Sequence, residues 1–406
     1  MANVTAKIER LGHLGDGIAE GPVYVPDVLP GEVLTGVVEG QRMTQVKIVQ
    51  PSPDRVKPPC PHAKSCGGCA LQHASDSFVS RWKQDVVRSA LLAHGIGAEI
   101  PDILTSPALS RVRAVLHGAR TKKGEMIGLY GRGTNNLVDT PNCLLLDPHI
   151  LQSLPALRAL TRLGASRKSV VRLTVTATDG GLDVCVDDAR EADMELRTSL
   201  SELTGSHDLA RLTWNGETIA QARKPFVQMG RAQVTPPPGA FLQATREGAA
   251  VLVSKVLACA KGSRRVVDLF SGCGTFALPI SEFSEVHAVE GIADLLNASA
   301  DGWRAAGGLH RMTTEKRDLF SRPLVALELD RFDLAVIDPP RAGAENQMKE
   351  IAQSKLKRVV SVSCNPVTFA RDASILIKAG FEMGPVTLVD QFRWSTHIEM
   401  VAGFRR

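Results

Sequence analysis

From residue 236 onward, short apolar runs rich in valine and isoleucine alternate with segments whose apolar positions recur at helical spacing. The apolar runs predict strands at 265–269, 285–289, 312–317, 332–337, 358–363, 386–390 and 397–403. Strands that alternate with helices in this way form a mostly parallel sheet covered by helices on both faces. We therefore predict an α/β fold here, with its ligand beyond the carboxyl ends of the strands.

The preceding part of the chain has a different pattern, in which strands dominate. Residues 1–54 contain short β-branched segments separated by glycine turns, which predicts a small closed β-barrel. Farther along, apolar positions over 76–94 repeat at helical spacing, and turn residues at 179–181 and 215–216 predict two hairpins. This pattern indicates a β-rich central region between the barrel and the α/β part.

Two proline-rich stretches, 51–61 and 235–239, separate these regions. The predicted domains are a barrel over 1–54, a central domain over 55–235 and an α/β domain over 236–406. A length of 406 residues and a hydrophobic content of 44% suffice for several packed cores.

Composition favours a cytoplasmic protein without a membrane span. No run approaches the roughly 20 apolar residues that cross a bilayer, and we expect no secretion signal. Cysteines in a reducing compartment bind metal or do chemistry more often than they form disulfides. A net charge of +5 is compatible with nucleic acid but is weak. The basic strip between Arg111 and Arg132 is either a solvated hairpin face or a contact for phosphates.

The segment Val267–Thr275 follows the first strand of the α/β part and contains a glycine turn at 272–274. Glu290 ends the second strand, where a carboxylate can accept both ribose hydroxyls of a nucleoside. Asp318 ends the third strand, where it can meet an adenine amino group. The third glycine of a dinucleotide fingerprint is missing, so the set favours S-adenosylmethionine over NAD.

A cysteine follows the fifth strand, in the sequence Ser-Cys-Asn-Pro at 363–366. The usual fate of a free cysteine is to be a small buried hydrophobe, but Cys364 stands outside the apolar run beside a proline-stiffened turn. Asp338 follows the neighbouring strand, and Glu399 lies on the predicted last strand. We expect Cys364 to be a nucleophile; for Glu399 alone, the alternative is a solvated or structurally paired acid.

Three cysteines cluster near residue 60 in the spacing Cys60-x5-Cys66-x2-Cys69, and Cys143 follows far downstream. The usual zinc pattern is two close pairs, whereas three clustered thiolates and one distant one better suit an iron–sulfur cube. Zinc and a redox pair at Cys66 and Cys69 remain as alternatives. The other cysteines, at 185, 259 and 273, match no ligand pattern.

With these motifs the chain resembles, over its whole length, the S-adenosylmethionine-dependent RNA uracil-5-methyltransferases. The shared signatures are Asp-Pro-Pro-Arg at 338–341, Ser-Cys-Asn-Pro at 363–366, His-Ile-Glu at 397–399 and Phe-Leu-Gln at 241–243. Together they are specific. RNA cytosine-5-methyltransferases carry a different cysteine pair after a Pro-Cys turn, and adenine-N6 enzymes lack the cysteine.

The resemblance implies that Cys364 adds to carbon 6 of a uracil and that Glu399 removes the proton from carbon 5. The uracil has to leave its stack to reach such a site. The cofactor-binding residues that the resemblance implies are Gln243, Phe270, Thr275, Glu290, Asp318 and Asp338. Thr275 departs from the pattern, because members of the family often have asparagine there.

A subgroup of the family holds a 4Fe–4S cluster with four cysteines so spaced, which implies Cys60, Cys66, Cys69 and Cys143 as its ligands. The resemblance also implies a TRAM-like N-terminal barrel that binds RNA. Iron–sulfur members mostly methylate 23S ribosomal RNA, so we expect that substrate, and a monomer. The alternatives are the T-loop of transfer RNA as substrate, and a non-catalytic RNA-binding or folding factor.

Overall fold

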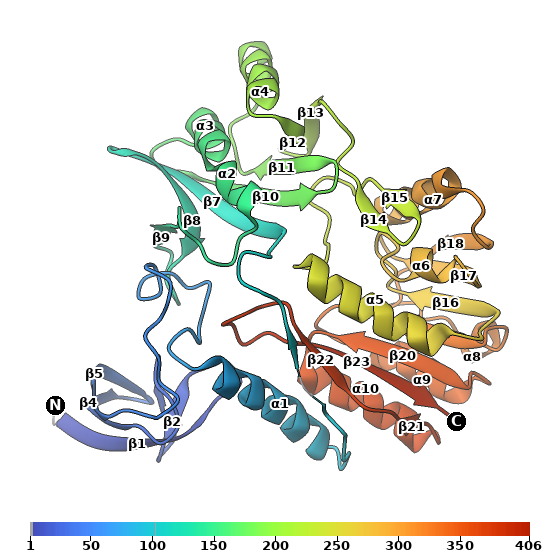
Figure 1. Ribbon diagram of the computed structural model, residues 1–406, viewed down its shortest axis with the longest axis horizontal. Helices are drawn as coiled ribbons and strands as arrows, with labels where there is room; N and C mark the ends of the chain where they lie inside the picture. Colours follow the sequence, from blue (N-terminus) through green and yellow to red (C-terminus); the bar gives the residue numbers. More distant parts are fainter. Residues whose placement is uncertain (1–2, 102) are drawn as a thin grey trace.

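The computed structural model describes residues 3–101 and 103–406 (Figure 1); residues 1–2 of the predicted barrel and residue 102 lie outside this description. The first five strands close into a barrel in the order β1-β2-β3-β5-β4, as predicted. They are β1 (Asn3–Leu11), β2 (Gly17–Ala19), β3 (Val23–Val25), β4 (Val33–Glu39) and β5 (Arg42–Gln50). Ile8, Leu34 and Met43 fill the interior of the barrel.

A seven-stranded sheet follows in the order β13-β12-β11-β10-β7-β8-β9. Its strands are β7 (Arg113–Thr121), β8 (Gly124–Tyr130), β9 (Leu137–Asp139), β10 (Val170–Thr178), β11 (Gly181–Asp187), β12 (Leu209–Trp214) and β13 (Glu217–Gln221). Helices α2 (Pro148–Gln152), α3 (Leu154–Gly164) and α4 (Met194–Ser206) pack with it around one core. Both predicted hairpins are present, and the second turns at Asn215 and Gly216 with φ of 48° and 86°, as a tight hairpin requires.

The largest sheet has the order β18-β17-β16-β19-β20-β23-β22-β6, and β21 pairs with β23. Its strands are β6 (Leu104–Thr105), β16 (Arg265–Leu269), β17 (Glu285–Glu290), β18 (Met312–Lys316), β19 (Leu334–Ile337), β20 (Arg358–Ser363), β21 (Glu382–Met383), β22 (Thr387–Asp390) and β23 (Glu399–Arg405). The run from β18 to β20 is parallel, and β23 is antiparallel to both of its neighbours. The order reverses between β16 and β19, and ligands of such sheets bind at this kind of switch point.

Helices cover both faces of this sheet, as the α/β pattern predicts. On one side are α5 (Arg246–Ala260), α6 (Ala277–Ile280) and α7 (Ala293–Ala306); on the other are α1 (Asp76–Leu92), α9 (Glu345–Gln353) and α10 (Pro366–Lys378). The short α8 (Ala326–Leu329) packs beside α9. Consecutive strand residues such as Val266 and Val267 belong to different cores, because side chains alternate between the faces of a strand. In Figure 1, α5 crosses in front of the sheet.

Two elements from the predicted central region join this large sheet. The side chains of Val87 and Leu91 on α1 enter the same core as α10, and β6 pairs with β22. A small hairpin of β14 (Val227–Met229) and β15 (Ala232–Val234) packs against α7. The domain boundaries near 54 and 235 stay predictions, since the chain crosses between the sheets more than once.

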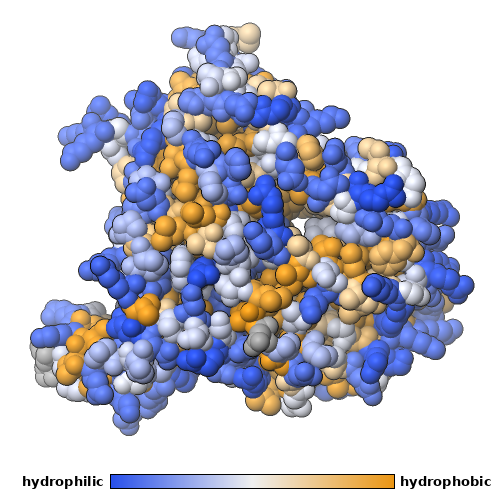
Figure 2. All heavy atoms as spheres, in the orientation of Figure 1, coloured by the Kyte–Doolittle hydropathy of each residue, from blue (hydrophilic) through white to orange (hydrophobic). Residues whose placement is uncertain are grey.

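The visible face of the molecule is mostly hydrophilic, with hydrophobic residues gathered along α5 (Figure 2). Val251, Val253 and Leu257 on this helix are only partly buried against the core. Among the described residues, no helix combines the length and the apolar character needed to cross a membrane.

Candidate active site and cysteine pocket

The two loops that carry the predicted nucleophile and its neighbouring acid are joined directly. The parallel strands β19 and β20 end at the same edge of the sheet, followed by Asp338 and Cys364. The Asn365 side chain donates from Nδ2 to the Arg341 carbonyl (2.9 Å), and its Oδ1 caps α10 by accepting from Val367 N (3.1 Å). This amide therefore fixes Cys364 between a strand end and a helix start.

Glu399 stands opposite Cys364 because of the strand register. Ser363 on β20 pairs with Met400 on β23, so the next positions in the antiparallel pair are Cys364 and Glu399. Glu399 is only 5% exposed, and Cys364 is half-buried. The structure thus brings together the three predicted residues Cys364, Glu399 and Asp338.

Burial raises the pKa values of all three groups, and the charges of neighbouring carboxylates raise those of Glu399 and Cys364 further. Burial raises the pKa of Asp338 to about 7. Burial, and then the Asp338 charge, raise the pKa of Glu399 to about 8. The pKa of the Cys364 thiol rises to about 11 through burial, then through Glu399 and Asp338, while the Arg341 charge acts in the opposite direction. The thiol is therefore neutral at pH 7 in the protein alone, and a positive charge bound here would favour its ionised form.

Arg341 is held in place by a histidine that the sequence reasoning did not single out. Its Nη2 donates to the His397 ring, 2.9 Å from Nδ1 and 3.2 Å from Nε2. Burial, followed by the charges of Arg341, Lys83 and Arg111, lowers the pKa of His397 to about 4. The imidazole is thus neutral and can accept the hydrogen bond. The only sequence signal for this role was the place of His397 two residues before Glu399.

The glycine turn after β16 is tied to the second predicted acid. Glu290 accepts from Gly272 N (3.1 Å) and from Ile292 N (3.0 Å). Phe270 has a φ of 60°, a strained conformation for a residue with a side chain, and its ring lies 5.3 Å from that of Phe320. The turn therefore has a fixed conformation at the switch point of the sheet, where a ligand can bind.

Asp268 is a further candidate that the sequence reasoning missed. Its carboxylate is fully buried, and within the described residues neither oxygen makes a well-formed hydrogen bond, although the Ala277 amide is near. Burial, and then Asp338, raise its pKa well above the usual range. The detectable signal was an acid inside the apolar run 265–269.

The remaining predicted cofactor residues lie around the same edge with less distinctive geometry. Gln243 accepts at Oε1 from Gln391 Nε2 (2.7 Å). Asp318 is exposed and accepts from Phe320 N (3.0 Å) and Ser321 Oγ (2.8 Å), which lower its pKa. Thr275 is partly exposed in the turn before α6.

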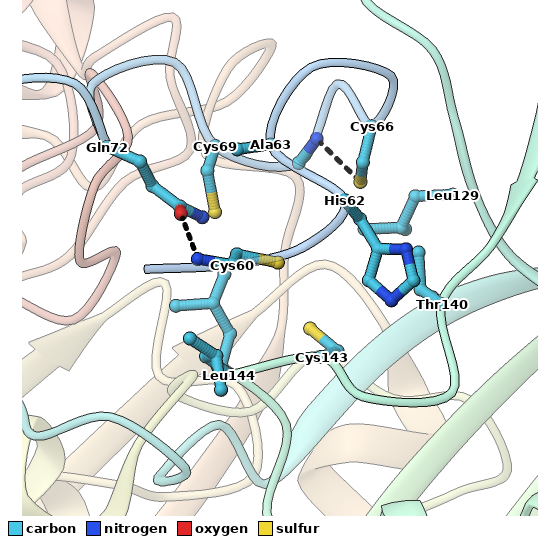
Figure 3. Close-up of a pocket in the computed structure, with 12 residues that line it drawn as sticks. Cys60, His62, Ala63, Cys66, Cys69, Gln72, Leu129, Thr140, Cys143 and Leu144 are labelled. Carbon is cyan, nitrogen blue, oxygen red and sulfur yellow. Dashed lines mark hydrogen bonds between the residues drawn. The ribbon is translucent and has the colours of Figure 1, made fainter. Parts of the chain in front are cut away.

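The four cysteines of the predicted cluster line one pocket away from Cys364, shown in Figure 3. Cys60, Cys66 and Cys69 come from the loop between the barrel and α1, and Cys143 comes from the loop after β9. We call this site the cysteine pocket. Gly67 seats its loop against β8: its N donates to Tyr130 O (2.9 Å), and a Cβ there would lie 2.9 Å from the same oxygen.

Burial raises the pKa values of two thiols of the cysteine pocket, Cys66 and Cys69. Burial raises the pKa of Cys69 to about 12, and the neighbouring thiols Cys143 and Cys66 add to the effect. Thiolates form at such a site only with a cation to stabilise them. No three histidine, cysteine or carboxylate side chains in the described part of the chain are close enough to hold a single ion. A cube is bound through separate iron atoms, so its ligands stand farther apart than those that share one ion.

Comparisons with known proteins give the family and the fold of the chain. The sequence model of the tRNA (uracil-5-)-methyltransferase family matches residues 230–404. An uncharacterised RNA methyltransferase of Rhizobium meliloti (strain 1021) is 41% identical, with 99% of each chain covered. The 23S rRNA (uracil(1939)-C(5))-methyltransferase RlmD of Chromohalobacter salexigens is 30% identical, over 97% of this chain and 87% of that protein.

Among solved structures, the tRNA (uracil-54, C5)-methyltransferase of Pyrococcus abyssi, in complex with S-adenosyl-L-homocysteine, has the same fold. Its TM-score is 0.77 at 23% identity, with 98% of this chain and 99% of that one covered. The fold is therefore that of an S-adenosylmethionine-dependent methyltransferase. Full-length relatives at 30% identity and above place the chain in the RNA uracil-5-methyltransferase family, and it is an enzyme of that class.

The raised pKa of Glu399 predicts a pH-dependent penalty on stability. Its pKa is near 8 when folded and 4.5 as a reference, so the folded chain binds more protons between these values. The free energy of unfolding then falls as pH rises through this window, by up to about 1.4 kcal/mol per pH unit for one group. We expect Glu399→Gln to gain stability over the wild type as pH rises from 5 to 9, measured by urea unfolding.

The exposed Asp318 provides the matched control. Its pKa is lowered, so it is ionised throughout this range and Asp318→Asn should show a pH-independent difference. An equal effect of Glu399→Gln at pH 5 and pH 9 would contradict the assignment of Glu399 as a buried acid.

Proposed function

We propose that this protein methylates carbon 5 of one uridine in 23S ribosomal RNA, with S-adenosylmethionine as the methyl donor. The observation that carries the proposal is the register that sets Cys364 opposite Glu399, next to Asp338, at the switch-point edge of the sheet. The full-length likeness to the Chromohalobacter salexigens RlmD supports ribosomal RNA as the substrate.

The chemistry requires these groups, because carbon 5 of uracil is a poor nucleophile. In the proposed reaction, the Cys364 thiol gives up its proton to a neighbouring base and its sulfur forms a bond to carbon 6. The π electrons of the ring move toward oxygen 4, which makes carbon 5 an enolate carbon. After carbon 5 is methylated, the Glu399 carboxylate removes its proton, and the electron pair re-forms the double bond and expels the Cys364 thiolate.

The cofactor, when bound, supplies the methyl group and a positively charged sulfonium. A cation beside Asp338, Glu399 and Cys364 lowers all three pKa values, which favours the ionised forms that the reaction needs. Phe270 and Phe320 offer apolar faces for an adenine, and Glu290 has remaining lone pairs for the ribose hydroxyls. We assign Gln243, Thr275, Asp318 and Asp338 to the same cofactor site, and add Asp268.

We also propose that the cysteine pocket holds a 4Fe–4S cluster through Cys60, Cys66, Cys69 and Cys143. Four thiols converge from two separate loops, and the rest of the lining is largely apolar, including Leu129, Leu144 and Leu145. This donor set suits iron–sulfur chemistry better than a hard cation. The cluster would staple the loop before α1 to the central sheet, a structural role.

We also propose how the protein contacts RNA and which oligomeric state it has. The N-terminal barrel acts as a TRAM-like module that contacts RNA together with Lys122 and Lys123, the exposed lysines of the basic strip, and the enzyme works as a cytoplasmic monomer. The second candidate substrate is the T-loop of transfer RNA, favoured by the name of the matching family model. A non-catalytic role would not require Cys364, Glu399 and Asp338 to stay together.

Substitution of the base is expected to trap an intermediate. Glu399→Gln should accumulate a covalent RNA–protein adduct that survives a denaturing gel, because the sulfur can add but the carbon 5 proton cannot be removed. Cys364→Ala is the matched control and should give neither adduct nor methyl transfer while still binding the cofactor. Normal turnover in the Cys364→Ala variant would refute the mechanism; Cys259→Ser, at a cysteine outside both sites, should behave as wild type.

The substrate is tested by mapping 5-methyluridine in RNA from a strain that lacks the gene. We expect one 5-methyluridine to disappear from 23S ribosomal RNA and to return on complementation with the wild type but not with Cys364→Ala. Loss from the T-loop of transfer RNA, with ribosomal RNA unchanged, would establish the second candidate in its place.

The cluster is tested by analysis of protein purified without oxygen. We expect a brown protein with about four irons and four sulfides per chain, and loss of both in Cys143→Ser, the ligand most distant in sequence. Cys185→Ser, at a buried cysteine outside the pocket, should keep the full content. A colourless wild type that contains zinc would refute the cluster.

A further inference from the structure

His62 also lines the cysteine pocket, together with the four cysteines. Its Nε2 atom is buried and, within the described ranges, has no hydrogen-bond partner. A buried ring nitrogen without a partner is unusual in a folded protein, since such groups almost always find a donor or acceptor. The atom therefore points to a partner that belongs to the group bound in the pocket.

The backbone holds His62 in one place between two of the cysteines. Its carbonyl accepts from Ser65 N (3.0 Å) and from Cys66 N (2.8 Å), which closes the turn from Cys60 to Cys66. In Figure 3 the ring extends from this turn to the side of the pocket where Thr140 and Cys143 lie, and it is drawn beside Thr140. The ring thus belongs to the part of the lining that the loop after β9 also supplies.

Two other polar side chains line the pocket, Gln72 and Thr140. Gln72 Oε1 accepts from Cys60 N (3.2 Å), and within the described residues neither side chain is a hydrogen-bond partner of His62 Nε2. Apart from these two, the cysteines and His62, the lining is apolar. Sulfide and thiolate sulfurs are therefore the acceptors that a bound cluster would bring to Nε2. We propose that His62 donates a hydrogen bond from Nε2 to a cluster sulfur on the Cys143 side; this inference rests on the cluster under Proposed function.

Such a bond has a defined effect on the cluster. A hydrogen bond to a cluster sulfur withdraws electron density and stabilises the more negative, reduced state, which raises the reduction potential. It also protects the sulfur from solvent. His62 is then a positioning and tuning residue next to the four ligands, and it is not itself a ligand.

The test measures the reduction potential of the full-length, anaerobically purified chain by dithionite titration with mediator dyes, followed by visible absorbance. His62→Leu should lower the potential by an amount that corresponds to a roughly tenfold change in the reduction equilibrium, about 59 mV for one electron. His62→Gln keeps an N–H donor and should recover most of the shift. His149→Leu, at an exposed histidine that bonds Asp147, should change nothing.

The iron and sulfide content of each variant distinguishes a failure of the cluster proposal from a failure of the role of His62. A wild type without iron and sulfide overturns the cluster itself. A His62→Leu variant with full iron content and an unchanged potential overturns the role of His62 alone. If His62→Leu loses the cluster while His62→Gln retains it, the donor role is supported; if both lose it, an N–H donor at this position is not sufficient and the inference is wrong.

Discussion

Two hydrogen bonds to the carbonyl of Trp394 connect the loop between β22 and β23 to the loop that carries Cys60, Cys66 and Cys69. This carbonyl accepts hydrogen bonds from Ala70 N and Leu71 N, both at 2.9 Å, directly after Cys69 of the cysteine pocket. The Trp394 ring is buried in the core of the central sheet, and its φ of 59° is a strained value that only such fixed surroundings maintain. This residue lies in the loop from β22 to β23, which ends at Glu399, so the cysteine loop directly limits where the proposed base can stand.

The same loop is anchored at its beginning by a buried ion pair. Lys83 on α1 lies 2.7 Å from Asp390, both almost fully buried, and its Nζ also donates to Phe392 O (3.4 Å). Removal of one partner of such a pair leaves an uncompensated buried charge, which costs about 3–5 kcal/mol. Arg111 from the central region completes the set, with its guanidinium 5.3 Å from the Phe392 ring. Elements far apart in sequence therefore contact one loop, and this loop connects the cysteine pocket to the candidate active site.

The sequence predicted the elements well, because they depend on local pattern. The strands of the large sheet and the closed barrel follow from periodicity, and the neighbouring positions of Cys364 and Asp338 follow from the rule that parallel strands end at one edge. The roles of these two residues and of Glu399 stay predictions. The sequence could not show that α1 and β6 join the C-terminal sheet, because that packing is set by contacts between distant segments. For the same reason His397 and Asp268 were not singled out: the contact of His397 with Arg341 and the complete burial of the Asp268 carboxylate exist only in three dimensions.

The electrostatics of the candidate active site explain why its residues need to be held in place by the surrounding contacts. Asp268, Asp338, Glu399 and Cys364 bring several acidic groups into a small, largely buried volume, where burial raises the pKa of each and the Asp338 charge raises those of the other three further. Ionisation of these groups lowers the free energy of unfolding. The arrangement therefore persists only because packing elsewhere in the structure stabilises it. Arg341 supplies a positive charge near these acidic groups. His397 accepts a hydrogen bond from Arg341 and is itself neutral, so it adds no second positive charge to the site. A site with this surplus of acids is preorganised for a cationic ligand, since one positive charge relieves the repulsion and favours the ionised forms of these groups.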